Sequence, residues 1–387
     1  MRRFVIALWM VFGVVCVTFG EDEFKPTVDF KGSRLAIGYL DSGSNGSYPA
    51  GSYQMPEAKL RFNWQMIPDM KVTVRLNLNN ATYKEIDYLC IDYSNLMAMA
   101  VPSLKDSAFN PLLRIGRFKL DIGEETWDNN AVEATSITPS VTNTGAYDEG
   151  IQLSQVLPKD KIGIPLKWSL SLSNGNTTTG ADNQQSKAVC AKIGVNPIKE
   201  LYISGSYYNS GELSNQSAEM TYAGLATPPT NATEWKRTIT ELDLRYDIKP
   251  GKENRLEPGA PAWSDSNAFF RLAYGQFKDD GKDTVAPIVS VTDRKGTYYF
   301  VEGTYNATEK LYITARESFV GFDKSTTFDS LNGVNANEYN RISVGAGYRL
   351  SANTHIKTEY VVNEEDVPAG TKEPKNNQVA ILITTKF

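Results

Sequence analysis

The stretch Gln378 to Phe387, QVAILITTKF, decides the fold of this chain. A β-strand points successive side chains to opposite faces, so Val379, Ile381 and Ile383 share one apolar face. The residues between them form a more polar face, which ends at Lys386. In a soluble protein, the edge of such a terminal strand would recruit other strands. In a closed transmembrane barrel the strand has a neighbour on each side, and a final aromatic residue lies at the membrane interface.

The start of the sequence has the pattern of a secretory signal. Arg2 and Arg3 precede an apolar run from Phe4 to Phe19, which is followed by the acidic residues Glu21 to Glu23 in the stretch EDEF. We therefore expect residues 1–20 to be a signal peptide that is removed on export. A membrane anchor is disfavoured because the run is shorter than the roughly 20 residues of a spanning helix. A lipoprotein is disfavoured because Cys16 follows valines instead of a small residue.

The composition excludes some classes of protein. Without Arg2 and Arg3 the chain has 38 basic and 45 acidic residues, a net charge of −7, which gives no reason to expect a nucleic-acid partner. No apolar stretch after the signal is long enough for a transmembrane helix. The mean hydropathy of −0.36 fits a soluble protein, and it also fits a barrel with a wet lumen and polar loops. The 20 Tyr, 16 Phe and 29 Gly suit a protein with many strands.

Alternating segments recur along the mature chain, residues 21–387, and predict a single all-β domain. The expected fold is a transmembrane antiparallel β-barrel of about 16 strands, although 14 or 18 remain possible. Short and long connections alternate, as periplasmic turns and extracellular loops do, except that the connections 95–111 and 250–266 are longer than a turn. The predicted strands are 33–41, 57–66, 70–79, 87–94, 112–122, 148–156, 165–174, 187–196, 201–210, 236–248, 267–278, 295–306, 310–321, 338–350, 354–363 and 378–387.

The two faces of these segments fit either a barrel or a soluble sandwich. In the segment 165–174, for example, Trp168 and Leu170 alternate with Lys167 and Ser169. A soluble sandwich would turn the polar set to the solvent, whereas a wide barrel turns the apolar set to lipid and the polar set to its lumen. The signal peptide, the terminal Phe387 and the alternating loop lengths favour the barrel. Cys90 and Cys190 lie on strands too far apart in this order for a disulfide.

Two segments resemble a known family. Gly116 to Gly123, GRFKLDIG, and Asp148 to Ile151, DEGI, resemble bacterial outer-membrane porins, in particular the group of phosphate-selective porins O and P. The last ten residues resemble the C-terminal signature of Gram-negative outer-membrane barrels. The resemblance implies a homotrimer and a third extracellular loop, here 123–147, that folds into the lumen. The coiled-coil segment of some such porins is absent, and so is a dense Lys/Arg ladder, so phosphate specificity is not implied.

The third loop and the nearby strands supply the candidate site. Acidic residues of the loop would face basic residues that the alternation turns to the lumen, and the resulting transverse field would align small polar solutes. In the alternative, the loop lies outside with solvated carboxylates. The basic excess of the candidates favours a weak preference for anions. The candidate pore-lining and constriction residues are Lys59, Arg61, Lys71, Arg75, Arg117, Lys119, Asp121, Glu124, Glu125, Asp128 and Glu133.

An enzyme is not expected. The sequence has one histidine, His355, near the periplasmic end of a predicted strand, with no serine motif near it to form a hydrolase triad. A single histidine also excludes a His-based metal cluster, although a calcium site at Asp279-Asp280 remains open. No phosphate-binding or flavin motif is present, so we expect no catalytic residue and no cofactor.

The sequence therefore predicts an outer-membrane porin for the passive diffusion of ions and small hydrophilic solutes, in contact with outer-membrane lipid. A substrate-specific channel for a sugar or an oxyanion is one alternative, which lumenal aromatics at Tyr202, Tyr208 and Phe300 would favour. A plugged structural or adhesive barrel that binds a partner through its loops is another. A soluble secreted β-sandwich lectin is the least favoured.

Overall fold

The computed structural model describes residues 25–46, 50–79, 85–142, 144–145, 147–175, 186–214, 221–222, 228–249, 266–285 and 287–387. The predicted signal peptide, residues 1–20, and most of the long connection 250–266 lie outside these residues. None of the described helices is long and apolar enough to cross a membrane.

Sixteen antiparallel strands of the described chain form one closed barrel. Each predicted strand is present, with bounds that differ by a few residues. The strands are β2 (Arg34–Ser42), β3 (Ser52–Ile67), β4 (Met70–Asn77), β5 (Glu85–Tyr93), β6 (Leu112–Lys119), β8 (Tyr147–Leu157), β9 (Leu166–Ser173), β10 (Ala188–Ile198), β11 (Leu201–Asn209), β14 (Glu234–Ile248), β15 (Ala268–Lys282), β16 (Arg294–Asn306), β17 (Leu311–Phe322), β20 (Glu338–Arg349), β21 (Thr354–Asp366) and β22 (Gln378–Lys386).

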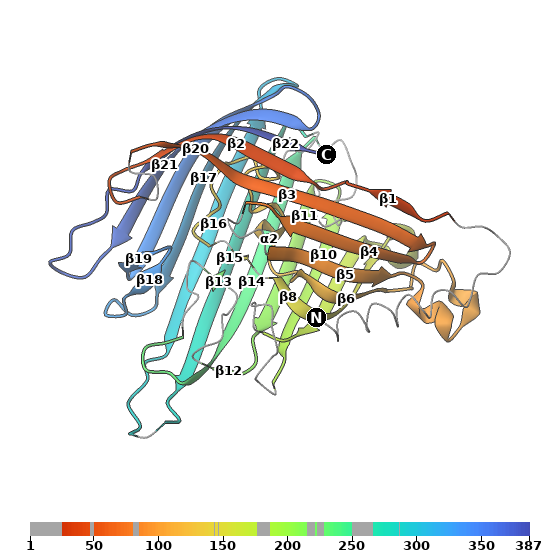
Figure 1. The fold of residues 1–387 in the computed structure, drawn as a ribbon, viewed down its shortest axis with the longest axis horizontal. Coiled ribbons are helices and arrows are strands. Elements are labelled where there is room, and N and C mark those ends of the chain that lie inside the picture. Colours follow the sequence, from red (N-terminus) through yellow and green to blue (C-terminus); the bar gives the residue numbers. More distant parts are fainter. Residues whose placement is uncertain are drawn as a thin grey trace.

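The first and last barrel strands pair and close the barrel (Figure 1). Ile37 of β2 lies opposite Ile383 of β22, and β2 pairs with β3 along its other edge. The backbone of Phe387 completes the seam, since its N–H donates to the Ser33 carbonyl at 2.9 Å and its carbonyl accepts from Gly32 N–H at 2.8 Å. The terminal strand therefore has two neighbours, as its alternation requires.

The apolar face of the strands points outward. Ile381 and Ile383 are 50% and 53% exposed, whereas Leu382 between them is fully buried. On β9, Leu172 is 55% exposed while Ser171 and Ser173 are buried. The polar sides of the strands are therefore the inward-facing ones, which is the arrangement of a barrel in lipid and the reverse of a soluble sandwich.

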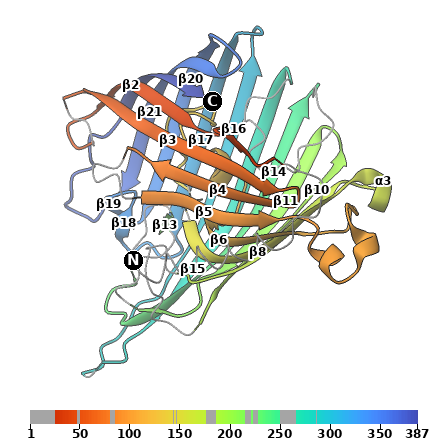
Figure 2. The same ribbon diagram turned by 45° about the vertical axis from the view of Figure 1, so that its right-hand side comes forward.

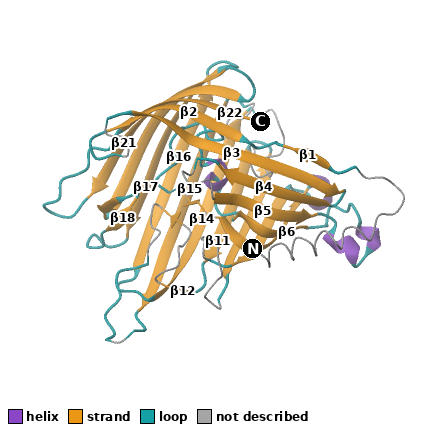
Figure 3. Ribbon diagram, in the orientation of Figure 1, coloured by secondary structure: helices purple, strands orange, loops and turns teal. Residues whose placement is uncertain are grey.

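The remaining elements are short and lie in the connections, as Figure 3 shows for the few helices, except β1, which precedes β2 and pairs with β3. Most connections at the end that carries the termini are tight turns, such as Pro68-Asp69 between β3 and β4. The β5–β6 connection at this end is longer and contains two 3₁₀ helices, Leu96–Met99 and Pro102–Leu104. The other short elements are α2 (Glu125–Asp128), α3 (Lys159–Ile162), β1 (Thr27–Asp29), β7 (Thr144–Gly145), β12 (Leu213–Ser214), β13 (Thr221–Tyr222), β18 (Asp329–Leu331) and β19 (Val334–Ala336).

The walls of the barrel differ in strand length. β14 and β15 have 15 residues each, whereas β4 and β6 have 8. A tilted strand needs about 9 to 11 residues to span the membrane. The long strands therefore extend beyond it, and Figure 2 shows β3 to β5 crossing in front of this longer wall.

Candidate functional site

The third loop, residues 120–146 between β6 and β8, contacts much of the inner wall. Its first residues contact inward-facing side chains of β9, β10, β11 and β14. Its later residues contact β16, β17, β20, β21 and β22. The described contacts thus run from β9 round to the terminal strand. The wall formed by β3, β4, β5 and the first part of β6 is left facing the rest of the lumen.

Two lysines of β9 and β10 hold the first carboxylates of the loop. Lys192 Nζ lies 2.6 Å from Glu124 Oε1 and 3.3 Å from Asp121 Oδ1, and Lys167 Nζ lies 2.9 Å from Asp121 Oδ2. Tyr202 also donates its hydroxyl to Glu124 Oε1 at 2.6 Å. Burial opposes ionisation, but the two ammonium groups outweigh it, so the pKa of Asp121 and that of Glu124 lie below their usual values.

Two charged residues of β21 bind the backbone of the later part of the loop. Lys357 Nζ donates to the carbonyls of Ala131 at 2.7 Å and Ala134 at 2.5 Å. One carboxylate oxygen of Glu359 accepts from the N–H groups of Ile137 at 3.0 Å and Thr138 at 2.7 Å. Hydrogen bonds between charged side chains and backbone are stronger than those between neutral groups. These contacts fix the path of the loop along β21.

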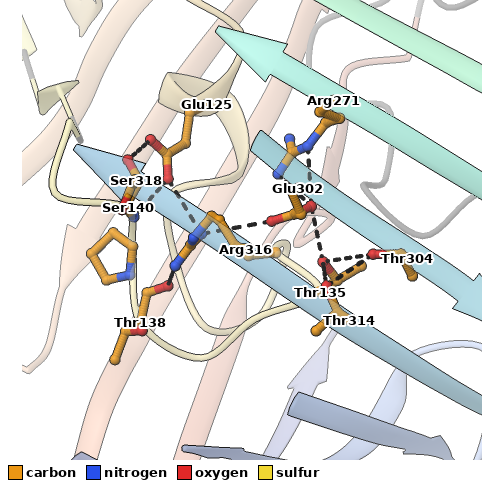
Figure 4. Close-up of polar contacts among 12 residues, drawn as sticks. Glu125, Thr135, Thr138, Ser140, Arg271, Glu302, Thr304, Thr314, Arg316 and Ser318 are labelled. Carbon is orange, nitrogen blue, oxygen red and sulfur yellow. Dashed lines mark hydrogen bonds and ion pairs between the residues drawn. The ribbon is translucent and has the colours of Figure 1, made fainter. Parts of the chain in front are cut away.

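An arginine of β17 lies between the third loop and the wall. Figure 4 shows Arg316 with its Nη1 3.5 Å from Glu125 of the loop and 3.7 Å from Glu302 of β16. Glu125 also accepts from the N–H of Ser140 at 2.8 Å, and Arg271 Nη2 lies 2.9 Å from Glu302. Each of these carboxylates therefore has an arginine beside it, which offsets the cost of burial.

Lys119 and Glu133, both candidates from the sequence, also have partners. Lys119 Nζ donates to the Thr126 carbonyl and, at 2.9 Å, to Asn129 Oδ1, so it supports the start of the loop. Glu133 lies 3.5 Å from Lys386 on the terminal strand. The side chain of Asp128 lies outside the described part of the structure.

The basic residues of β3 and β4 form a wall in which acidic neighbours are interleaved. Lys59 Nζ lies 2.6 Å from Asp87 of β5, and Arg75 Nη2 lies 3.1 Å from the same carboxylate. The Arg75 guanidinium also lies 4.5 Å from the ring centroid of Tyr88 and donates to the Tyr147 hydroxyl at 2.5 Å. Lys59 and Arg75 therefore both pair with Asp87, a residue that the sequence analysis did not single out.

A lumenal cavity of about 520 Å³ lies between this wall and the third loop. Arg114 and Lys71 share one carboxylate there, since Arg114 Nε lies 2.6 Å from Asp92 Oδ1 and Lys71 Nζ lies 3.7 Å from Asp92 Oδ2. Arg61 donates to Asn63 Oδ1 at 2.9 Å, and no carboxylate of the described residues lies within ion-pair distance of it. The charged lining consists of the cations Arg61, Lys71, Arg114 and Lys167 and the carboxylates Asp69, Asp92 and Asp121.

The two segments that resemble porins are partners across the sheet. Gly116 lies opposite Gly150, and Arg117 lies opposite Glu149, to which it pairs at 3.4 Å. Residues two positions apart on a strand share a face, so Arg117 lies on the same face of β6 as Ile115, which is 47% exposed on the outer side. The structure therefore places Arg117 apart from the cluster that Lys59, Arg61, Lys71 and Arg75 form.

Sequence reasoning missed the partners of the third loop. Among the described side chains, Asp121, Glu124 and Glu125 of the loop pair with cations of β9, β10 and β17, and not with the basic wall of β3 and β4; these cations are Lys167, Lys192 and Arg316. Strand parity could have placed Lys167 and Lys192 on the inner face, because apolar residues flank each of them, whereas Arg316 is followed by the charged Glu317. Their pairing with the third loop could not be predicted, because a contact between residues far apart in the chain leaves no pattern in the local sequence.

The histidine, the two cysteines and the candidate calcium ligand that the sequence analysis considered all lie among other protein groups. His355 is buried on the inner face of β21, and its ring lies 6.5 Å from that of Tyr312. Cys90 and Cys190 are buried and free. Asp279 accepts from Arg237 at 2.8 Å and from Arg294 at 2.7 Å, so arginines occupy the carboxylate that was considered for calcium.

The aromatic residues considered for a sugar channel are not open to the lumen. Tyr202 and Phe300 are 3% and 2% exposed, and Tyr208 is fully buried. Tyr208 belongs to a cluster of apolar side chains inside the barrel, which includes Val141 of the third loop and Leu331 of β18. These rings therefore pack against protein and offer no exposed face for stacking.

The fold is that of the outer-membrane porins. The outer membrane channel DcaP of Acinetobacter baumannii has a TM-score of 0.60 at 13% identity, covering 96% of this chain and 100% of that chain. OmpT of Vibrio cholerae in its trimer form has 0.59 at 12% identity, covering 94% and 100%. An anion-selective porin from Comamonas acidovorans has 0.58 at 10% identity, covering 94% and 100%. No protein-family model and no curated protein matches the sequence.

Proposed function

We propose that this chain is an outer-membrane porin, exported through a signal peptide at residues 1–20, that lets ions and small hydrophilic solutes diffuse passively. The supporting observation is a closed 16-strand barrel with an apolar exposed outer face and a charged inner face. A barrel of this size is too wide for its own side chains to fill. The porin fold of DcaP and OmpT agrees with this proposal. Catalysis and a cofactor have no part in it.

The third loop narrows the lumen in this proposal. Its contacts run along the wall from β9 to β22, so the water-filled passage follows the opposite wall, formed by β3 to β6. Lys59, Arg61, Lys71 and Arg75 lie on that wall, and the charged cavity of about 520 Å³ belongs to the passage. Small polar solutes pass beside fixed charges that replace part of their hydration, and large or apolar ones are retarded.

A weak preference for anions follows from the charges of the passage. Four cations and three carboxylates line the cavity, and Arg61 is the lining cation without a carboxylate partner among the described residues. An uncompensated cation attracts anions and repels cations at the narrow part of a pore. The resemblance to phosphate-selective porins extends only to the paired segments of β6 and β8, so the preference proposed here is for small anions in general.

A homotrimer is part of the proposal. The resemblance to porins implies it, and OmpT of Vibrio cholerae was solved in a trimer form. Chemical cross-linking of the protein in native outer membranes would give a band at three times the mass of the monomer. A monomer band alone, with a cross-linked porin of known trimeric state as control, would contradict the trimer.

Swelling of liposomes in sugar solutions tests the proposed function. Vesicles that contain the refolded protein should swell at a rate that falls steeply as the sugar grows from a pentose to a trisaccharide. Vesicles without protein are the control. Absence of swelling with every sugar, from protein whose folding is shown by heat-modifiable migration on gels, would refute an open porin.

A plugged barrel that binds a partner through its loops is the second candidate. It is favoured by the hairpin of β18 and β19, where Asn332 donates to the Val141 carbonyl of the third loop at 3.2 Å. Leu331 and Ala336 of this hairpin are fully buried against the interior cluster. The swelling experiment separates this candidate from the porin, because a plugged barrel gives no permeability.

A further inference from the structure

The β5–β6 connection, residues 94–111, is a folded element at an end of the barrel where most connections are tight turns. Asn95 is its centre, with 6% of its side chain exposed. Its amide donates to Asp69 at 2.7 Å and to Asp106 at 3.0 Å, and its oxygen accepts from Asn110 at 2.9 Å. Asn95 and Asp106 both have left-handed backbones, with φ of 60° and 57°. A network of this kind holds the element in one shape.

The element holds apolar side chains outside any core. Met97, Met99, Val101 and Phe109 are 41%, 73%, 43% and 54% exposed. A flexible turn could fold such side chains away, but the Asn95 network and a hydrogen bond from the Met97 N–H to Asn110 at 2.7 Å fix their backbone. Exposed apolar side chains that are gathered on a rigid element mark a surface that contacts something.

The position of the element indicates what it contacts. Gln155 of β8 donates to the Ala108 carbonyl at 2.7 Å, and Trp168 of β9 donates to Gln155 at 3.3 Å. Trp168 lies on the same face of β9 as the outward-facing Leu170 and Leu172. The element therefore touches the lipid-facing wall beside a tryptophan at the strand end, which is the position of the interfacial aromatic girdle. Figure 3 shows its helices beyond the ends of β5 and β6.

We propose that the β5–β6 connection inserts into the phospholipid headgroup layer of the inner leaflet of the outer membrane. Its apolar side chains continue the lipid-facing surface beyond the strand ends, as those of interfacial amphipathic segments do. The next connection, between β8 and β9, adds Ile162 and Ile164, which are 39% and 41% exposed. Lys105 and Lys159, one in each connection, are exposed and suit phosphate groups. The proposal requires a membrane-embedded barrel but not an open lumen.

Nitroxide spin labels test this placement. Met99→Cys and Phe109→Cys are labelled in the refolded full chain, in vesicles of phosphatidylethanolamine and phosphatidylglycerol. Leu172→Cys is the hydrocarbon reference, and Ser44→Cys in an extracellular loop is the water reference. The parent protein, whose Cys90 and Cys190 are each 2% exposed, gives the labelling background. Collision with oxygen reports contact with lipid, and collision with a water-soluble nickel chelate reports contact with water.

Both labels in the connection should show an oxygen-to-nickel collision ratio several-fold above that of position 44 and below that of position 172. Ratios equal to that of position 44 would place the element in the periplasm and overturn the proposal. Labels at 99 and 109 that are protected from both reagents would place the element in a protein interface, between copies of the chain or with another protein, and would overturn it too. Heat-modifiable migration shows that each variant is folded.

Discussion

Arg61 differs from the neighbouring cations of the barrel wall because no carboxylate of the described residues lies within ion-pair distance of it. Lys59 and Arg75 share Asp87, and Lys71 and Arg114 share Asp92. Each of these carboxylates is shared by two cations, so each group keeps a net positive charge that adds to the charge of Arg61. We therefore expect Arg61 to contribute to the anion preference together with these two groups.

Replacing Arg61 tests this expectation. Arg61→Gln should shift the reversal potential in a KCl gradient towards cation preference, with a change in the permeability ratio of about two- to fivefold. This change in the permeability ratio is expected because a unit charge about 8 Å from the permeating ion contributes about 0.5 kcal/mol of interaction energy in water. Arg61→Lys keeps the charge and should leave the ratio unchanged. Equal ratios for the parent protein and Arg61→Gln would exclude Arg61 as the source of selectivity.

The attachment of the third loop at Lys192 should resist acid. The pKa of Asp121 lies well below its ordinary value of 3.8, because the ammonium groups of Lys192 and Lys167 overcome the effect of burial. A carboxylate with a lowered pKa contributes its full stability above the unfolded pKa and loses it as the pH falls through the folded one. The carboxyl carbon resonance of Asp121 should therefore show no titration from pH 7 to about pH 4.5 and should shift only below the ordinary carboxylate range. Titration of Asp121 between pH 7 and pH 5 would contradict this assignment.

For single residues, the sequence predicted which side chains share a strand face, but it did not predict the partners of those side chains. Alternation along β3 and β4 placed Lys59, Arg61 and Arg75 together, because one face of a strand follows from sequence parity. The pairing of Glu124 with Lys192 joins residues 68 positions apart, and no local pattern encodes such a contact. Arg117 was predicted to belong with these residues, and in the structure it lies opposite Glu149 on β8.

The position of the third loop depends on one lysine of β21, Lys357. Lys357→Met should leave the carbonyls of Ala131, Val132 and Ala134 without their charged donor and lower the free energy of unfolding by about 2 to 3 kcal/mol. The released loop should also make single-channel currents noisier. Denaturant titration in lipid vesicles and bilayer recording measure the two effects. Lys372→Met, at an exposed loop position, is the matched control, and identical noise in the two variants would contradict an anchoring role.

The β5–β6 strand pair depends on a glycine. Gly116 has φ of +121°, and a Cβ there would lie 2.2 Å from the Leu89 carbonyl oxygen. Gly116→Ala should therefore destabilise the barrel by at least about 1 kcal/mol. Gly303→Ala is the control, because a Cβ at Gly303 meets nothing within 4 Å. The two variants are compared by the denaturant concentration that halves heat-modifiable migration, and equal midpoints would show that the strand pair can adapt.

The sequence predicted the barrel strands more completely than any other feature of the structure. All sixteen barrel strands were predicted, because a strand with one face in lipid repeats its alternation over eight residues or more. The β18–β19 hairpin and the pair β7–β13 were missed, since strands of two or three residues carry too little periodicity. The fold of the β5–β6 connection was also missed, because its Asn95 network uses residues that individually indicate only a turn.

For the whole molecule, closure of the barrel and the path of the third loop together define the proposed passage. The seam between β2 and β22 leaves no free strand edge, and the outer surface is apolar enough to face lipid. The described residues of the third loop contact the wall from β9 to β22, so the proposed passage for solutes is the space beside β3 to β6. The central claim is that this space is open and filled with water.

Single-channel recording in a planar bilayer with a KCl gradient tests whether the passage is open. An open passage should give stable stepwise openings and a reversal potential with the sign of a weak anion preference. Stable openings with the opposite sign would keep the porin and refute the role given to Arg61. A silent bilayer, from protein shown to be folded and heat-modifiable, would contradict the open passage and favour the plugged barrel.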